Sequence, residues 1–179
     1  MLRLQCQAKY TPENVGHFGL ALSDYVHFTS PIRRYADLLI HRALIKGCGM
    51  PDGGELESGA NVPQFKEIGE HLCNTERTAV QAERDTLSRY LSAYLEPSIG
   101  AKFETKITGL TTAGIFVAID SLGAEGLIPM HTLPSDKYQF SAGGNEMVGA
   151  KTGRRFMMGD RLTACLTEAS PISGTLAFK

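Results

Sequence analysis

The sequence of 179 residues contains no tryptophan, only four cysteines and no long apolar run. The cysteines form no CxxC pair, and none lies at zinc-ligand spacing from a histidine; they are Cys6, Cys48, Cys73 and Cys165. This excludes the common zinc frameworks and favours reduced thiols, so we expect a cytoplasmic protein. No segment approaches the roughly 18 apolar residues of a membrane helix. The N-terminal stretch lacks a signal-peptide pattern, and we expect no membrane partner.

Neither sign of charge predominates, because the formal net charge is −1. Residues 1–96 carry 10 basic and 12 acidic residues, and residues 97–179 carry 8 and 7. Bulk charge therefore gives no sign of a nucleic-acid partner, and any such site must be a local patch.

The first half of the chain has a helical pattern. Residues 24–30 read as a strand leading into a helix cap, and a helix is predicted over residues 31–46, with Pro31 in its first turn. A longer helix is predicted over residues 63–95, before Pro97 and Gly100. Its apolar residues recur at helical spacing; they are Phe65, Ile68, Leu72, Val80, Leu87, Leu91 and Tyr94.

After residue 98 the pattern changes to short alternating segments separated by Gly, Asp and Pro. The five segments are 101–110, 114–120, 124–130, 160–169 and 175–179. Five short strands in about 80 residues predict a small closed barrel of the OB type. The predicted class is thus α+β, with two main helices in residues 1–97 and a five-stranded barrel in residues 98–179.

The stretch "HFTSPIRRYADLLIHR", residues 27–42, concentrates polar chemistry at a predicted helix start. Free backbone N–H groups at a helix N-terminus favour an anion, and the Arg33 guanidinium can bind two phosphate oxygens at once. Asp37 lies three residues after Arg34 and four after Arg33, so it can position either arginine. Taken alone, the same pattern also fits a surface helix capped by Ser30, with a weak Arg–Asp ion pair.

The segment "GHFGLALSDYVHFTSPIRRYADLLIHR" closely resembles the signature of the RNB family of exoribonucleases, the ribonuclease II and ribonuclease R group. The later "AERD" resembles the closing helix of that domain. Residues 100–130 resemble an S1 RNA-binding domain, and "SDKYQF" and "GRRFMMGDRL" are more similar to the ribonuclease R branch. The resemblance covers nearly the whole chain.

The resemblance implies a processive 3′-to-5′ exoribonuclease that hydrolyses single-stranded RNA to 5′-nucleotides with Mg²⁺ bound by clustered aspartates. Arg33 would then steady phosphate charge in the transition state. Ser30 and Asp37 would support it. Further RNA contacts would come from Arg34, Tyr35, His41, Arg42 and Glu83.

The barrel would bind single strands by aromatic stacking beside basic side chains. The candidates are Phe116, Lys137, Tyr138, Arg154 and Arg155, although strand aromatics are more often core residues. The S1 pattern departs from its usual form at Ala113, which replaces a phenylalanine, and at Pro129, which replaces a histidine. This weakens the usual stacking surface.

The aspartates of this sequence form no metal-binding run, and the resemblance places the family's aspartate cluster upstream. We therefore expect a C-terminal fragment of the enzyme that binds RNA, binds no metal and is inactive alone. Apolar faces left without partners could drive self-association. The alternatives are a non-catalytic single-stranded RNA-binding module and a scaffold that only packs on a partner.

Overall fold

The computed structural model describes residues 9–54, 56, 62–141 and 143–179. Cys6 and residues 55 and 57–61, between the two predicted helices, lie outside the described residues. Contacts divide the chain into two compact units, Met1–Val80 and Gln81–Lys179. Each unit is described by itself.

The first unit contains the short 3-10 helix η2 (Phe18–Leu20), the helix α1 (Tyr35–Gly47) and the first part of α2 (Val62–Leu95). The strand predicted over residues 24–30 is wrong, because none of these residues belongs to a strand or a bridge. An isolated bridge joins His17 to Leu22 instead. Most of this segment therefore depends on side chains for its contacts.

Helix α1 begins four residues later than predicted. Residues 31–33 form a turn, in which the amides of Arg33 and Arg34 donate to the Ser30 carbonyl at 3.3 and 3.0 Å. Arg34 is the N-cap residue in an extended conformation, and no side chain caps the helix. The predicted cap at Ser30 and helix start at Pro31 are thus wrong, because the N-cap position falls at Arg34 and the helix begins at Tyr35.

Helix α2 confirms the long helix, but its apolar stripe is only partly buried. Val80, Leu87 and Tyr94 are 41%, 57% and 68% exposed. Near the C-terminal end, Leu95 is fully buried, and Leu91 packs against the core of the second unit. The second unit therefore includes the last turns of α2, whereas the predicted boundary at residue 97 stays a prediction.

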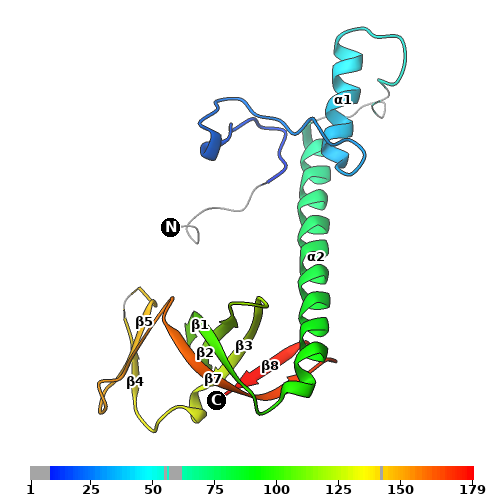
Figure 1. The fold of residues 1–179 in the computed structure, drawn as a ribbon. Helices are drawn as coiled ribbons and strands as arrows, with labels where there is room; N and C mark the ends of the chain where they lie inside the picture. The colour runs from blue at the N-terminus through cyan, green and yellow to red at the C-terminus, as the bar shows by residue number, and fades with distance from the viewer. Residues whose placement is uncertain (1–8, 55, 57–61, 142) are drawn as a thin grey trace. The chain divides into compact units, whose positions relative to one another are not determined.

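The second unit is a closed barrel with strand order β1-β2-β3-β8-β7 (Figure 1). Its strands are β1 (Lys102–Thr111), β2 (Gly114–Ile119), β3 (Ala124–Pro129), β7 (Arg161–Ser170) and β8 (Thr175–Phe178). All five coincide with the predicted segments to within about two residues, which confirms the barrel and the α+β class. Neighbouring strands are antiparallel except β3 and β8, which pair in parallel at Leu127 and Ala177.

The barrel interior follows from the alternation of side chains along its strands. Ile115, Val117 and Phe178 are fully buried. A Cβ at Gly126 would lie within 2.4 Å of the Phe178 ring, so a glycine lets this ring pack beside β3. Close packing therefore fixes which residues of each strand face the barrel interior.

A second, three-stranded sheet was not predicted. Its strands are β4 (Tyr138–Phe140), β5 (Glu146–Gly149) and β6 (Arg155–Met157), in the order β4-β5-β6. Met147 and Phe156 from this sheet belong to the same buried cluster as the barrel core. Two 3-10 helices complete this unit, η3 (Glu96–Ser98) and η4 (Met130–Thr132). Among the residues that the structure describes, no helix combines the length and the apolar character needed to cross a membrane.

Candidate nucleic-acid interface

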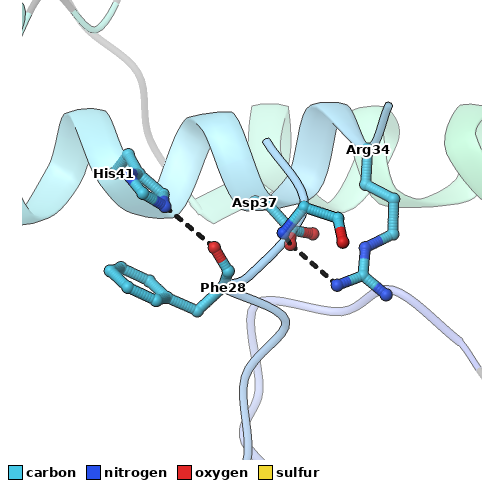
Figure 2. Close-up of polar contacts among 5 residues, drawn as sticks. Phe28, Arg34, Asp37 and His41 are labelled. Carbon is cyan, nitrogen blue, oxygen red and sulfur yellow. Dashed lines mark hydrogen bonds and ion pairs between the residues drawn. The ribbon is translucent and has the colours of Figure 1, made fainter. Parts of the chain in front are cut away.

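The predicted anion-binding segment is organised around the buried carboxylate of Asp37. Its Oδ2 accepts from the Ser30 amide and from Arg34 Nη2, each at 2.8 Å (Figure 2). Asp37 is completely buried, and the Arg34 side chain is 22% exposed. Of the two arginines that spacing allowed, the structure pairs Arg34 with Asp37.

The electrostatics of this pair follow from burial and hydrogen bonding. Burial by itself raises the pKa of the Asp37 carboxyl, but hydrogen bonds from Arg34 and from the Ser30 amide outweigh it. The pKa of Asp37 therefore lies below its ordinary value. Asp37 Oδ1, Arg34 Nε and His27 Nδ1 are buried and have no hydrogen-bond partner among the described residues. Because unsatisfied buried polar atoms are costly, this cluster could still bond a further polar group.

Arg33 differs from Arg34 in its environment. It lies exposed in the turn before α1, and no ion pair to its side chain occurs among the described residues. Arg33 therefore presents a guanidinium to solvent, whereas Arg34 is occupied inside the fold. The catalytic role predicted for Arg33 stays a prediction.

His41 has a structural contact in this unit. Its Nε2 lies 2.8 Å from the Phe28 carbonyl oxygen, and its ring stacks on the Phe28 ring with centroids 4.2 Å apart (Figure 2). Since a carbonyl only accepts, Nε2 carries the proton. Of the other predicted contacts, Tyr35 is 45% exposed, Arg42 is half-buried on α1, and Glu83 is exposed on α2.

The basic residues predicted in the barrel domain lie around the unpredicted β4-β5-β6 sheet. Lys137 and Arg154 are exposed, and Arg155 Nη1 lies 3.5 Å from Glu146 Oε1. The Arg154 guanidinium lies 5.3 Å from the centre of the Phe156 ring, a cation–π arrangement. The Tyr138 hydroxyl donates to the Pro134 carbonyl at 3.0 Å, which favours a packing role for this side chain.

Sequence reasoning missed Asp136 and Lys151 at this sheet. The Asp136 carboxylate accepts four hydrogen bonds, from the Lys137, Lys151 and Thr152 amides and from Thr152 Oγ1. These bonds, the Thr152 hydroxyl first, keep the pKa of the Asp136 carboxyl far below its usual range. The glycine-rich segment "GAKTG", residues 149–153, was the sequence signal that could have indicated a tight turn held by hydrogen bonds.

Two of the concave regions in the described part of the barrel unit adjoin predicted RNA-binding residues. A cavity of about 210 Å³ is lined by Leu133, Pro134, Arg154, Phe156 and Lys179, among others. It is smaller than the roughly 300–1,000 Å³ of drug-sized sites. A groove of about 350 Å³ contains Phe116, which is 39% exposed, together with the carboxylates of Glu125 and Glu168. These carboxylates disfavour phosphate beside Phe116.

Six of the seven aspartates among the described residues have partners within the fold, and Asp52 is the exception. Beyond Asp37 and Asp136, Asp160 accepts from the Met157 amide, and Asp120 pairs with Arg161 at 3.4 Å. Asp85 accepts from Gln81 and Asp24 from Ser23. No group of three or more metal-ligating side chains occurs within the described ranges. The carboxylates of the described residues therefore do not fit a magnesium site.

Two family models match this chain, the RNB model in its first part and the S1 model in its second, which is the order that the sequence motifs indicate. The RNB domain matches residues 1–48, and the S1 RNA binding domain matches residues 96–168. Curated relatives include ribonuclease R of Aquifex aeolicus, 41% identical over 90% of this chain and 22% of the relative. Ribonuclease R of Escherichia coli is 38% identical over 90% of this chain and 21% of the relative. The chain thus spans about a fifth of the length of these relatives.

Solved structures give the same result. RNase R of Mycoplasma genitalium in complex with ribose methylated single-stranded RNA is similar, with a TM-score of 0.85 and 31% identity. The match covers 99% of this chain and 28% of that one. The apo form of the same protein has a TM-score of 0.83 and 32% identity, over 97% of this chain and 27% of that one.

Proposed function

We propose that this chain binds single-stranded RNA, because it matches an RNB domain model followed by an S1 RNA binding domain model and is similar to ribonuclease R. We further propose that it takes part in 3′-to-5′ hydrolysis of RNA to 5′-nucleotides. The observation that carries RNA binding is the closed barrel, which presents cations without carboxylate partners in its described part. Among them are Lys137, Lys151 and Arg154. Phosphate contacts dominate nucleic-acid affinity, and basic residues around an OB-type barrel supply them.

The proposed phosphate ligand in the first unit is Arg33. Its exposure in the turn before α1 supports this role, since a guanidinium free of carboxylate can fork onto two phosphate oxygens. Arg34 acts differently, because its pairing with Asp37 fixes the turn that carries Arg33. In hydrolysis Arg33 would stabilise the negative charge that develops on the phosphate.

Magnesium-dependent cleavage needs carboxylates that converge on the metal. Since the aspartates of the described residues form no cluster, and most of them are bonded within the fold, we propose that these 179 residues bind RNA and do not cleave it on their own. The metal-binding carboxylates would come from another part of an RNB domain. This chain would contribute RNA binding and the arginine.

A paired binding and cleavage assay tests both statements. Fluorescence anisotropy with a labelled single-stranded RNA of about 12 nucleotides measures affinity, within the range of 4–16 nucleotides that an OB fold covers. Release of nucleotides from the same RNA with Mg²⁺ measures cleavage. We expect binding without release. Magnesium-dependent release that Arg33→Ala abolishes would contradict the second statement, and no binding at low salt would contradict the first.

A second candidate is a scaffold that packs on a protein partner. Exposed apolar side chains on α2 favour it; among them are Leu87, Tyr90 and Tyr94. A scaffold has no reason to bind RNA in a salt-dependent way, so the same titration separates the two candidates.

A further inference from the structure

Asp136 joins two backbone segments beside the β4-β5-β6 sheet. Its Oδ1 accepts from the Lys137 amide at 2.7 Å and from the Lys151 amide at 2.9 Å. Its Oδ2 accepts from the Thr152 amide at 2.9 Å and from Thr152 Oγ1 at 2.7 Å. One carboxylate thus bonds two loops that are about 15 residues apart in the sequence.

The backbone reinforces this arrangement. The Ala150 amide donates to the Lys137 carbonyl, and the Gly149 amide donates to the Arg154 carbonyl, each at 2.9 Å. A Cβ at Gly149 would lie 2.4 Å from Asp136 Oδ2, so glycine is required for the carboxylate to approach so closely. Thr152 Oγ1 also accepts from the Arg154 amide at 3.3 Å. The backbones of Lys137, Lys151 and Arg154 are therefore bound into one small region.

The charges of this region are not balanced by carboxylates. Residues 136–155 contain four basic and two acidic residues. Glu146 pairs with Arg155, and the Asp136 carboxylate is occupied by its four hydrogen bonds. Lys137, Lys151 and Arg154 thus have no carboxylate partner in the described part of the chain. We call these three residues the basic site.

On the premise of the RNA binding proposed above, we infer that the basic site binds the phosphodiester backbone of RNA and that Asp136 is its positioning residue. A loop that becomes ordered on binding loses conformational entropy, which weakens the affinity. A loop that is already held by hydrogen bonds avoids most of this cost. Asp136 is thus an acidic residue that strengthens the binding of an anion. The groove beside Phe116, with its two carboxylates, is less suited to phosphate.

The positioning role predicts a change in RNA affinity opposite to the one that charge alone predicts. Asp136→Asn removes a negative charge near the RNA, and simple electrostatics then predicts tighter binding. A positioning role predicts weaker binding, because the amide group cannot accept at both oxygen positions. For single strands log Kobs falls by about 0.7 per log unit of salt for each phosphate contact, so one contact is worth about five-fold in affinity at about 0.1 M salt.

The test compares Asp136→Asn with Glu96→Gln, which removes the same charge from the exposed 3-10 helix η3 of the same unit. Affinity for a labelled single-stranded RNA is measured from about 0.05 to 0.2 M salt. We expect Asp136→Asn to bind about three- to ten-fold more weakly at about 0.1 M salt, with a shallower salt slope. Glu96→Gln should bind as tightly as the unmodified chain or slightly tighter.

Amide hydrogen exchange provides the structural measurement. In Asp136→Asn the amides of Lys151 and Thr152 should exchange faster, while the buried Ile115 amide keeps its protection. Faster exchange with unchanged or tighter binding overturns the positioning role. If this variant unfolds the barrel, Lys137→Gln and Lys151→Gln decide: each should lower affinity about five-fold, and unchanged affinity overturns the basic site. An unmodified chain that binds no RNA overturns the proposed function along with this inference.

Discussion

Replacing Leu95 with alanine should destabilise the barrel unit strongly, although Leu95 lies on a helix outside the barrel strands. Leu95 is 1% exposed and belongs to the same buried cluster as Ile115 and Phe178. Leu→Ala at such a site costs about 2–5 kcal/mol, from lost transfer free energy and the remaining cavity. For a unit of roughly 100 residues this is a large part of the total stability, and the melting temperature falls about 4–8 °C for each kcal/mol.

The same helix offers a matched control in Leu87, which is 57% exposed. Leu87→Ala makes the same chemical change, and alanine is the better helix former, so we expect a change within about 0.5 kcal/mol. The comparison therefore isolates burial against the barrel from effects on the helix itself.

Thermal unfolding of the 179-residue chain, followed by far-UV circular dichroism, gives the melting temperatures. The chain has no tryptophan whose fluorescence could follow unfolding of the barrel. Amide hydrogen exchange at Ile115 and Val117 therefore serves as the probe specific to the barrel. A loss below about 1 kcal/mol for Leu95→Ala, or a loss equal to that of Leu87→Ala, would refute the conclusion that the end of α2 is part of the barrel unit.

Three further predictions concern the first unit. Arg33→Ala should weaken RNA binding without changing the melting temperature. Arg34→Ala should instead lower the helicity of α1, measured by circular dichroism, because it removes the partner of a buried carboxylate. Equal effects of the two variants on binding and helicity would contradict their separate roles. Because the pKa of Asp37 is lowered on folding, its contribution to stability is fully present above its unfolded pKa of about 3.9 and is lost as the pH falls through the lower folded value. A titration of the Asp37 carboxyl by nuclear magnetic resonance should give a midpoint below about 3.9, and a midpoint above it would refute the hydrogen-bond assignment. Phe18 and Ile32 are 98% and 102% exposed, so we expect a mass that rises with concentration in light scattering, and a constant monomer mass would contradict self-association.

The barrel could be predicted from sequence because its strands alternate over four to ten residues, long enough for a period of two to be recognised. The second sheet could not be predicted in the same way. Strands β4 and β6 have three residues each, which is too short for a periodic signal, and their pairing depends on contacts that form only in the folded unit.

The start of α1 shows how a tertiary contact can override a local signal. Ser30 followed by Pro31 is typical of a helix cap, yet residues 31–33 form a turn, and the Ser30 amide donates to the Asp37 carboxylate across it. Spacing alone allowed Asp37 to pair with Arg33 or Arg34, and packing decided for Arg34. Asp136 was missed because its role depends on loops brought together by the sheet.

The salt dependence of RNA binding tests the central claim most directly, that the barrel unit of this chain binds RNA through phosphate contacts at the basic site. We predict that log Kobs for a labelled single-stranded RNA falls linearly with log salt, and that Lys137→Gln and Arg154→Gln each make the slope shallower by about 0.7. An affinity independent of salt, or slopes that both substitutions leave unchanged, would contradict the claim.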